Sequence, residues 1–176
     1  TVRAEAVLPD KIGNPWAYIR ASQQDIRIYV DGELREEYST KATRPFGKTS
    51  ASVYVFFPLY EEDGGKVLTV ETVSDSVYSG RMNQIFTGEK YDIVKSFVAE
   101  SGLLLVVAFT TVIISVITVV ISLILRMVHK KEVDIIFLGV GTLLTALVLV
   151  VGGVMRQFYL SNITVATLAG FLLTML

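Results

Sequence analysis

Three side chains in the first half of the chain are of types that bind ligands at protein surfaces: Trp16, Arg44 and Arg81. Trp16 follows the turn sequence Gly13-Asn14-Pro15, where an exposed indole would stack on a sugar or another planar ligand. The alternative is that Trp16 closes the edge of the core, in keeping with the general burial of tryptophan. Arg44 and Arg81 have the forked geometry that pairs with a carboxylate or phosphate, although most surface arginines are only solvated.

Other kinds of chemistry are excluded by the residue types present. The chain has no Cys and one His, so disulfides, thiolate metal sites and cysteine nucleophiles are excluded. Three consecutive acids, Glu61, Glu62 and Asp63, have the oxygen ligands of a divalent cation, but adjacent side chains in a turn point in different directions. We therefore expect a solvated turn there and no metal site. Because no nucleophile, base and orienting residue can be assembled, the sequence predicts neither a cofactor nor a catalytic site.

The charged residues are concentrated in the first part of the chain. Residues 1–100 hold 12 of the 16 Lys and Arg and 15 of the 17 Asp and Glu, while the whole chain is 52% hydrophobic. A pI near 5.8 without a basic surplus is not typical of nucleic-acid-binding proteins. This distribution predicts two domains, a globular one at 1–100 and a transmembrane one at 101–176.

Three apolar segments in the second part are predicted to span a membrane. Residues 103–125 carry no charge over 23 positions, which as a helix extend about 35 Å, enough for a hydrocarbon core of about 30 Å. Residues 135–155 form a second span, and 163–176 begin a third that stops short. Because the chain starts at Thr1 without Met and stops inside an apolar run, we expect both ends to be cut.

The basic residues between the spans predict the orientation. Arg126, Lys130 and Lys131 lie in the first loop, against Arg156 alone in the second, which places the first loop in the cytoplasm and residues 1–100 outside it. The first loop also holds His129, and we expect this basic cluster to anchor the chain on anionic lipid headgroups. The predicted location is therefore a cell membrane crossed more than once, with membrane lipids as partners.

Four small hydroxyl residues occupy one face of the first span: Thr111, Ser115, Thr118 and Ser122. Their spacing predicts a helix-packing face, because small polar residues let helices approach and form hydrogen bonds. Gly139, Gly141 and Thr145 form a weaker version of this pattern on the second span. Neither complete span contains an ionisable residue, which disfavours a transporter.

Period-two alternation in residues 1–100 predicts short β-strands. Ile26, Ile28 and Val30 alternate with polar residues, and Asp31-Gly32 is the signal of a type I′ hairpin turn. Tyr54 and Phe56 share one face of a strand predicted at 52–59, and we expect them in the core. Seven or eight such strands predict an all-β sandwich, a jelly roll, followed by transmembrane helices.

The sequence also resembles a family. Residues 18–34, Arg-Pro-Phe-Gly-Lys at 44–48, Tyr-Val-Phe-Phe-Pro-Leu at 54–59 and the strand at 84–89 resemble the extracellular sensor of bacterial seven-transmembrane receptors with diverse intracellular signalling modules. The resemblance implies a jelly roll of galactose-binding type, a bacterial cell membrane and an output domain outside this chain, often a diguanylate cyclase with a GGDEF motif.

Two functions follow as expectations. The first is a sensory receptor module whose sandwich binds an extracytoplasmic ligand, with carbohydrate as one candidate, and relays its state through the helices. The second is an envelope adaptor, in which the sandwich binds another protein and the spans only anchor it. A homodimer is one candidate assembly for either function.

Overall fold

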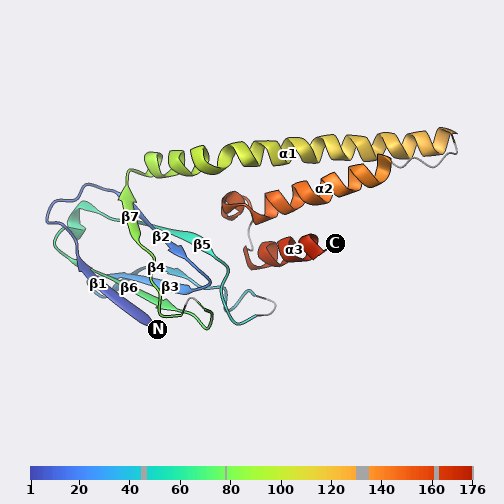
Figure 1. The fold of residues 1–176 in the computed structure, drawn as a ribbon. Coiled ribbons are helices and arrows are strands. Elements are labelled where there is room, and N and C mark those ends of the chain that lie inside the picture. The colour runs from blue at the N-terminus through green and yellow to red at the C-terminus, as the bar shows by residue number, and fades with distance from the viewer. Residues whose placement is uncertain (45–46, 78, 130–134, 161–162, 176) are drawn as a thin grey trace. The chain divides into compact units, whose positions relative to one another are not determined.

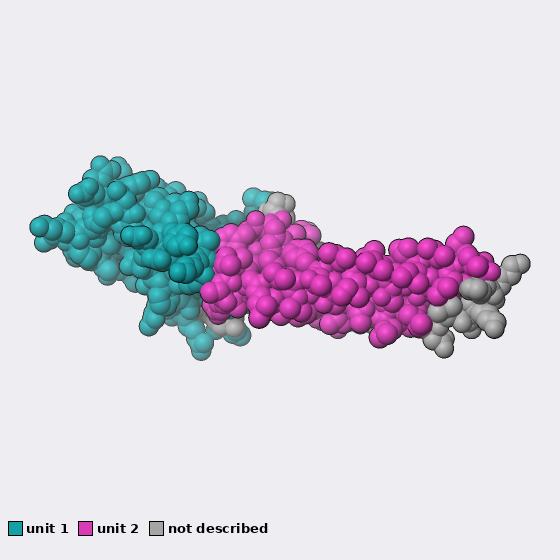
Figure 2. Space-filling view, turned by 90° about the horizontal axis from the view of Figure 1, so that it is seen from above, with its two compact units in different colours: residues 1–96, 162–164 teal, residues 97–161, 165–176 magenta. Residues whose placement is uncertain are grey.

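The computed structural model describes residues 1–44, 47–77, 79–129, 135–160 and 163–175. The chain divides into two compact units, residues 1–96 with 162–164 and residues 97–161 with 165–176 (Figure 2). All of the strands belong to the first unit, and most of the helical residues belong to the second.

In the described part of the first unit, seven strands form two antiparallel sheets (Figure 1). Sheet A has the strand order β1-β6-β3-β4, and sheet B has the order β5-β2-β7, so β1 and β4 are the edges of sheet A. The strand bounds are β1 Val2–Val7, β2 Trp16–Ala21, β3 Asp25–Val30, β4 Glu33–Tyr38, β5 Val53–Pro58, β6 Val67–Val73 and β7 Ile85–Gly88.

The core lies between the two sheets. Along β3, for example, Ile26, Ile28 and Val30 are buried while Arg27 and Tyr29 face outward. One cluster of buried residues draws on both sheets: Ala17, Ile19, Ala21, Val53, Val55 and Phe57 from sheet B and Ile26, Ile28, Val30, Leu68 and Val70 from sheet A. The predicted all-β sandwich is therefore confirmed, since each sheet buries one face against the other.

The turn between β3 and β4 is the hairpin that the sequence predicts. Asp31 and Gly32 both have positive φ, 48° and 82°, which a type I′ turn requires at its two central positions. The Asp31 carboxylate also accepts a hydrogen bond from the Val67 N–H at 3.0 Å. The turn is thus tied to β6, the neighbouring strand in sheet A.

Tyr54 and Phe56 are not in the core, contrary to the expectation from the sequence. Val53, Val55 and Phe57 fill the inner face of β5, while Tyr54 and Phe56 are half-buried on its outer face. Both faces of this strand are apolar in sequence, so alternation could not decide which one points inward.

Asp63 also departs from the expected solvated turn. Glu61 and Glu62 are exposed, but the Asp63 side chain is fully buried. Its carboxylate accepts a hydrogen bond from the Tyr60 N–H at 2.9 Å and lies 3.0 Å from the Arg35 guanidinium and 3.4 Å from the Lys66 ammonium.

The electrostatic surroundings of Asp63 change its protonation equilibrium. Burial by itself raises the pKa of the Asp63 carboxyl, but the Tyr60 N–H and the charges of Arg35 and Lys66 outweigh burial and lower the pKa below its usual value. The carboxylate therefore holds the turn 61–63 to β4 through Arg35.

The second unit is built from apolar helices. Helix α1 spans Lys90–His129, α2 spans Ile135–Gly152 and α3 spans Ile163–Met175, with a 3₁₀ turn, η2, at Val154–Phe158. Among the described residues two helices, α1 and α2, are long and apolar enough to cross a membrane, and the apolar helix at 164–175 is shorter.

These helices differ in detail from the predicted spans. Residues 103–125 lie inside α1, but the second helix ends at Gly152, three residues before the predicted end of its span at 155. Lys130 and Lys131 of the predicted cytoplasmic loop lie outside the described residues.

Candidate ligand-binding groove and helix junction

The outer face of sheet A carries a row of alternating charges. Arg3, Glu71, Arg27 and Glu37 lie directly opposite one another across β1, β6, β3 and β4. The Arg3 and Glu71 side chains are 3.6 Å apart, and those of Arg27 and Glu37 are 2.8 Å apart. Opposite charges at facing positions stabilise such a sheet modestly and leave little net charge along the row.

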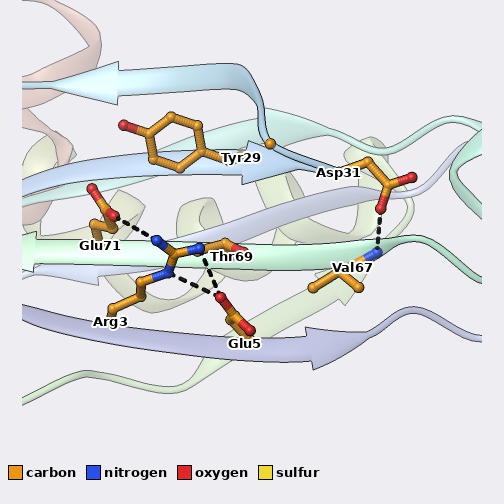
Figure 3. A pocket seen from close by; sticks show the side chains of 8 residues that line it. Arg3, Glu5, Tyr29, Asp31, Val67, Thr69 and Glu71 are labelled. Atoms are coloured by element: carbon orange, nitrogen blue, oxygen red, sulfur yellow. Dashed lines mark hydrogen bonds and ion pairs between the residues drawn. The ribbon is translucent and has the colours of Figure 1, made fainter.

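A groove of about 480 Å³ lies on this face, next to the charged row (Figure 3). Its residues come from three neighbouring strands and from the β3–β4 turn, so the turn and the sheet build it together. The lining residues are Arg3, Glu5, Tyr29, Asp31, Gly32, Val67, Thr69 and Glu71.

The one cation among the lining residues is held by two glutamates. The Arg3 guanidinium lies 2.8 Å from the Glu5 carboxylate and 3.6 Å from that of Glu71, and Figure 3 shows it between them. Because both carboxylates already neutralise this guanidinium, Arg3 is poorly placed to attract an anionic ligand.

Two of the residues that line the groove carry hydroxyl groups. The Thr69 residue is 5% exposed and lines the groove from β6. The half-buried Tyr29 faces the groove from β3. Each hydroxyl can both donate and accept a hydrogen bond.

The outer face of sheet B is aromatic. Tyr18 lies directly opposite Phe56 on β5 and Phe86 on β7. Its ring stacks on Phe86 with the centroids 5.3 Å apart, and it contacts Phe56 at 5.7 Å and Tyr54 at 6.0 Å. Aromatic pairs in such geometries add to the stability of the sheet beyond their burial.

Trp16 begins β2 at the end of this aromatic face. It is half-buried, and the Lys90 ammonium lies 4.2 Å from the centroid of its ring, in cation–π geometry. The structure therefore places this candidate ligand contact against the first residue of α1. Whether it also contacts a ligand stays a prediction.

The join between sheet B and α1 is short. Only Glu89 separates β7 from α1, so residues 90–102, which precede the apolar segment at 103–125, are helical. The Ile93 N–H donates to the Glu89 carbonyl at 3.0 Å, and the Ile93 side chain is buried close to Gly88. The first turn of α1 is thus packed against the strand that precedes it.

The two candidate arginines lie in different loops. Arg44 is half-buried after β4, where its backbone N–H donates to the Thr40 carbonyl at 2.8 Å. Arg81 is exposed before β7, and its carbonyl accepts a hydrogen bond from the Gln24 amide at 2.6 Å. Among the described residues no contact joins either arginine to Trp16 or to the other, and neither lines the groove on sheet A.

The predicted helix-packing face of α1 is the side that meets α2 at Ser115. Ser115 and Ser122 are buried, Thr111 and Thr118 are half-buried, and the Ser115 hydroxyl donates to that of Thr142 at 2.9 Å. On α2, a Cβ added at Gly139 would lie 2.9 Å from the Val119 side chain, so this glycine permits a close approach. Gly141 has open space around it, and Thr145 is exposed.

The groove residues were missed at the level of sequence because no motif marks them. Thr69 and Glu71, like Arg3 and Glu5, are ordinary polar residues at alternating positions of the sequence. The pairing of β1 with β6 and of β6 with β3 brings them together, and strand order cannot be read from alternation.

Comparison with protein-family models, with curated proteins and with solved structures gave no match to this chain. Within the described residues, no group of three His, Cys, Asp or Glu side chains is arranged to hold a metal ion.

Proposed function

We propose that this chain is the sensory and transmembrane part of a bacterial receptor. In this proposal the sandwich is an extracytoplasmic jelly roll that binds a ligand, and the helices relay its state to an output domain outside the chain. The observation that carries the proposal is the join of β7 to α1 through a single residue.

Such a join supports a relay for a mechanical reason. Helix α1 has 40 residues, about 60 Å at 1.5 Å per residue, without a break between Lys90 and His129. Its first turn is attached to the sandwich by the Ile93 contact and by the Lys90–Trp16 pair. A displacement of β7 is therefore passed to a stiff rod, whereas a flexible linker would absorb it.

The proposed orientation places the sandwich outside the cytoplasm. It is supported by the basic residues, since Arg126 ends the apolar part of α1 and two lysines follow it in the sequence. Because the chain has no Cys, one introduced thiol can be labelled without background. We expect an impermeant maleimide to label Glu62→Cys on intact cells and to label Met127→Cys only after permeabilisation, and the reverse pattern would refute the orientation.

The relay is tested by uncoupling the join. Spin labels at Ile114→Cys on α1 and Val140→Cys on α2, both exposed positions, report the distance between the helices in the full chain in lipid nanodiscs. Two glycines inserted between Glu89 and Lys90 should shift or broaden that distance distribution.

The control for this experiment is the same insertion after Gly13, an exposed position with open space around it. It should leave the distance distribution of the parent chain unchanged. If the insertion at Glu89 also leaves it unchanged, the helices do not sense the sandwich. The adaptor function, in which the helices only anchor the sandwich, would then replace the receptor function.

A further inference from the structure

We propose that a cleft between α2 and α3 is a binding site for a single glycerophospholipid molecule. The headgroup phosphate pairs with the Arg156 guanidinium, and an acyl chain lies along the cleft. Its lining includes Val148, Val151 and Gly152 from α2, Arg156 from η2, and Gly170 and Phe171 from α3. The inference rests on the proposed function in taking these helices as part of the transmembrane half of the receptor.

Arg156 supplies the charge at one end of the cleft. It is the only charged residue in the described ranges 135–160 and 163–175, and residues 135–176 contain no Asp or Glu. Its guanidinium donates to the Gly152 carbonyl at 3.2 Å, which holds the side chain at the end of α2. That bond uses one of the five N–H donors of a guanidinium, and the forked arrangement of these donors matches a phosphate.

The rest of the cleft is mostly apolar. Val148 and Val151 line it from α2 and Phe171 from α3. Two glycines leave the space open: a Cβ added at Gly152 would meet nothing within 4 Å, and one added at Gly170 would already contact the Val151 side chain at 3.6 Å. The cleft therefore combines a cationic end with an apolar wall, as the two parts of a phospholipid require.

The size of the cleft favours a thin chain over a compact ligand. Its volume is about 200 Å³, below the range of about 300–1,000 Å³ that is usual for pockets that hold a whole small molecule. An acyl chain fills such a space with part of its length and leaves the rest in the bilayer. The charge and the volume thus agree on the same class of ligand.

Other occupants match only one half of the site. A soluble phosphate would pair with Arg156 and leave the apolar wall uncovered. An apolar helix packed over the cleft would bury the guanidinium, and α2, η2 and α3 supply no carboxylate to compensate its charge. In the proposed orientation Arg156 is extracytoplasmic, so this site is separate from the basic residues of the first loop.

The experiment uses the full chain in detergent micelles and a phosphatidylglycerol that carries a photoactivatable group on one acyl chain. After irradiation and digestion, we expect labelled peptides from residues 148–174, which hold the cleft. Two unlabelled competitors separate the parts of the ligand. Diacylglycerol has the chains without the phosphate, and glycerol 3-phosphate has the phosphate without the chains. Each should need at least about tenfold more than phosphatidylglycerol to compete.

One variant tests the charge. Arg156→Gln should raise the half-saturating lipid concentration for labelling of the cleft by about tenfold, the loss expected for one charge-assisted hydrogen-bonded contact. Arg126→Gln is the matched control, because it removes a guanidinium near the end of α1 that does not line the cleft. It should leave the labelling of the cleft unchanged.

A second variant tests the space. Gly170→Leu should fill the cleft and abolish its labelling, whereas Gly141→Leu, at an exposed glycine of α2 with open space around it, should not. Melting curves in the same detergent identify variants that keep the parent fold, and only those are compared.

The proposal is overturned if the cleft is not labelled in the parent chain, if either competitor acts at the same concentration as phosphatidylglycerol, or if both Arg156→Gln and Gly170→Leu are labelled as the parent is. These outcomes are separate from those of the proposed function. The maleimide and spin-label experiments need no lipid in this cleft, and the labelling needs no movement of α1, so either proposal can fail while the other stands.

Discussion

Ser115 on α1 and Thr142 on α2 join the two helices through their hydroxyl groups. The Ser115 hydroxyl donates to the Thr142 hydroxyl at 2.9 Å, and the Thr142 hydroxyl in turn lies 2.9 Å from the Leu138 carbonyl, one turn back on α2. Both hydroxyls are therefore satisfied without water, as groups in an apolar surrounding must be.

The first prediction concerns this contact. Ser115→Leu should force α1 and α2 apart, because Ser115 is 2% exposed and the larger side chain has no room beside Thr142. The lost hydrogen bond accounts for about 0.6 kcal/mol, and the overpacking for about 1–3 kcal/mol. Ile114→Leu, at a position 59% exposed, should leave the thermal stability in detergent unchanged. Equal melting curves for the two variants would contradict the packing role of Ser115.

The second prediction concerns the two glycines of α2. A methyl group at Gly139 would lie 2.9 Å from Val119, whereas one at Gly141 meets nothing within 4 Å. Gly139→Ala should therefore widen the separation of the helices, measured between spin labels on α1 and α2. Gly141→Ala is the control: it should leave that separation unchanged, while alanine stabilises the helix itself.

The third prediction concerns the join of sheet B and α1. Lys90→Gln removes the cation that lies over Trp16, a contact that contributes about 0.5–1 kcal/mol at an exposed site. Because Trp16 is the only tryptophan, its fluorescence reports this join alone. We expect a changed emission and faster amide exchange in the first turn of α1.

The control is Lys95→Gln, which removes a cation 6.0 Å from the Tyr91 ring on the same helix. Its fluorescence should equal that of the parent chain. An unchanged spectrum for Lys90→Gln would show that the pair with Trp16 does not form in solution.

The fourth prediction concerns Asp63 and pH. Because its pKa is lowered in the folded protein, the carboxylate contributes stability that is complete above the unfolded pKa of about 4 and is lost as the pH falls through the folded value. Asp63→Asn should lower the free energy of unfolding by roughly 2–4 kcal/mol at pH 7, since Arg35 and Lys66 lose their partner.

The measurement is urea unfolding at pH 7 and at about pH 3. The difference between the parent chain and Asp63→Asn should shrink at the lower pH. Glu62→Gln is the control, because this neighbouring acid is exposed. A difference that stays constant with pH would mean that folding does not lower the pKa of the Asp63 carboxyl.

Local patterns in the sequence predicted local structure well. Alternation at Ile26, Ile28 and Val30 identified β3 and its inner face, and the Asp31-Gly32 pair identified the hairpin. Both depend on contacts within a few residues, so a single segment carries the information. The apolar stretches likewise identified the long helices, although not the start of α1 at Lys90.

The candidate groove needed information that no single segment carries. Arg3 and Glu71 are 68 positions apart and become neighbours only when β1 pairs with β6. Asp63 was misjudged for the same reason, because the cation that favours its burial, Arg35, lies on β4. From sequence alone a charged residue is expected to be exposed to solvent, because its burial needs a partner. Here the partners lie on distant strands.

The charged row on sheet A bears on how copies of the protein avoid one another. An edge strand with open N–H and C=O groups invites pairing with a second chain, and charged side chains discourage that pairing. The edge strand β4 carries Glu33, Arg35, Glu36 and Glu37 among its six residues, and β1 carries Arg3 and Glu5. In sheet B, the edge strand β7 has only four residues. The other edge of sheet B, β5, has six residues and none of them is charged. The edges of sheet A are thus protected against edge-to-edge pairing, and a homodimer of this chain would not form through them.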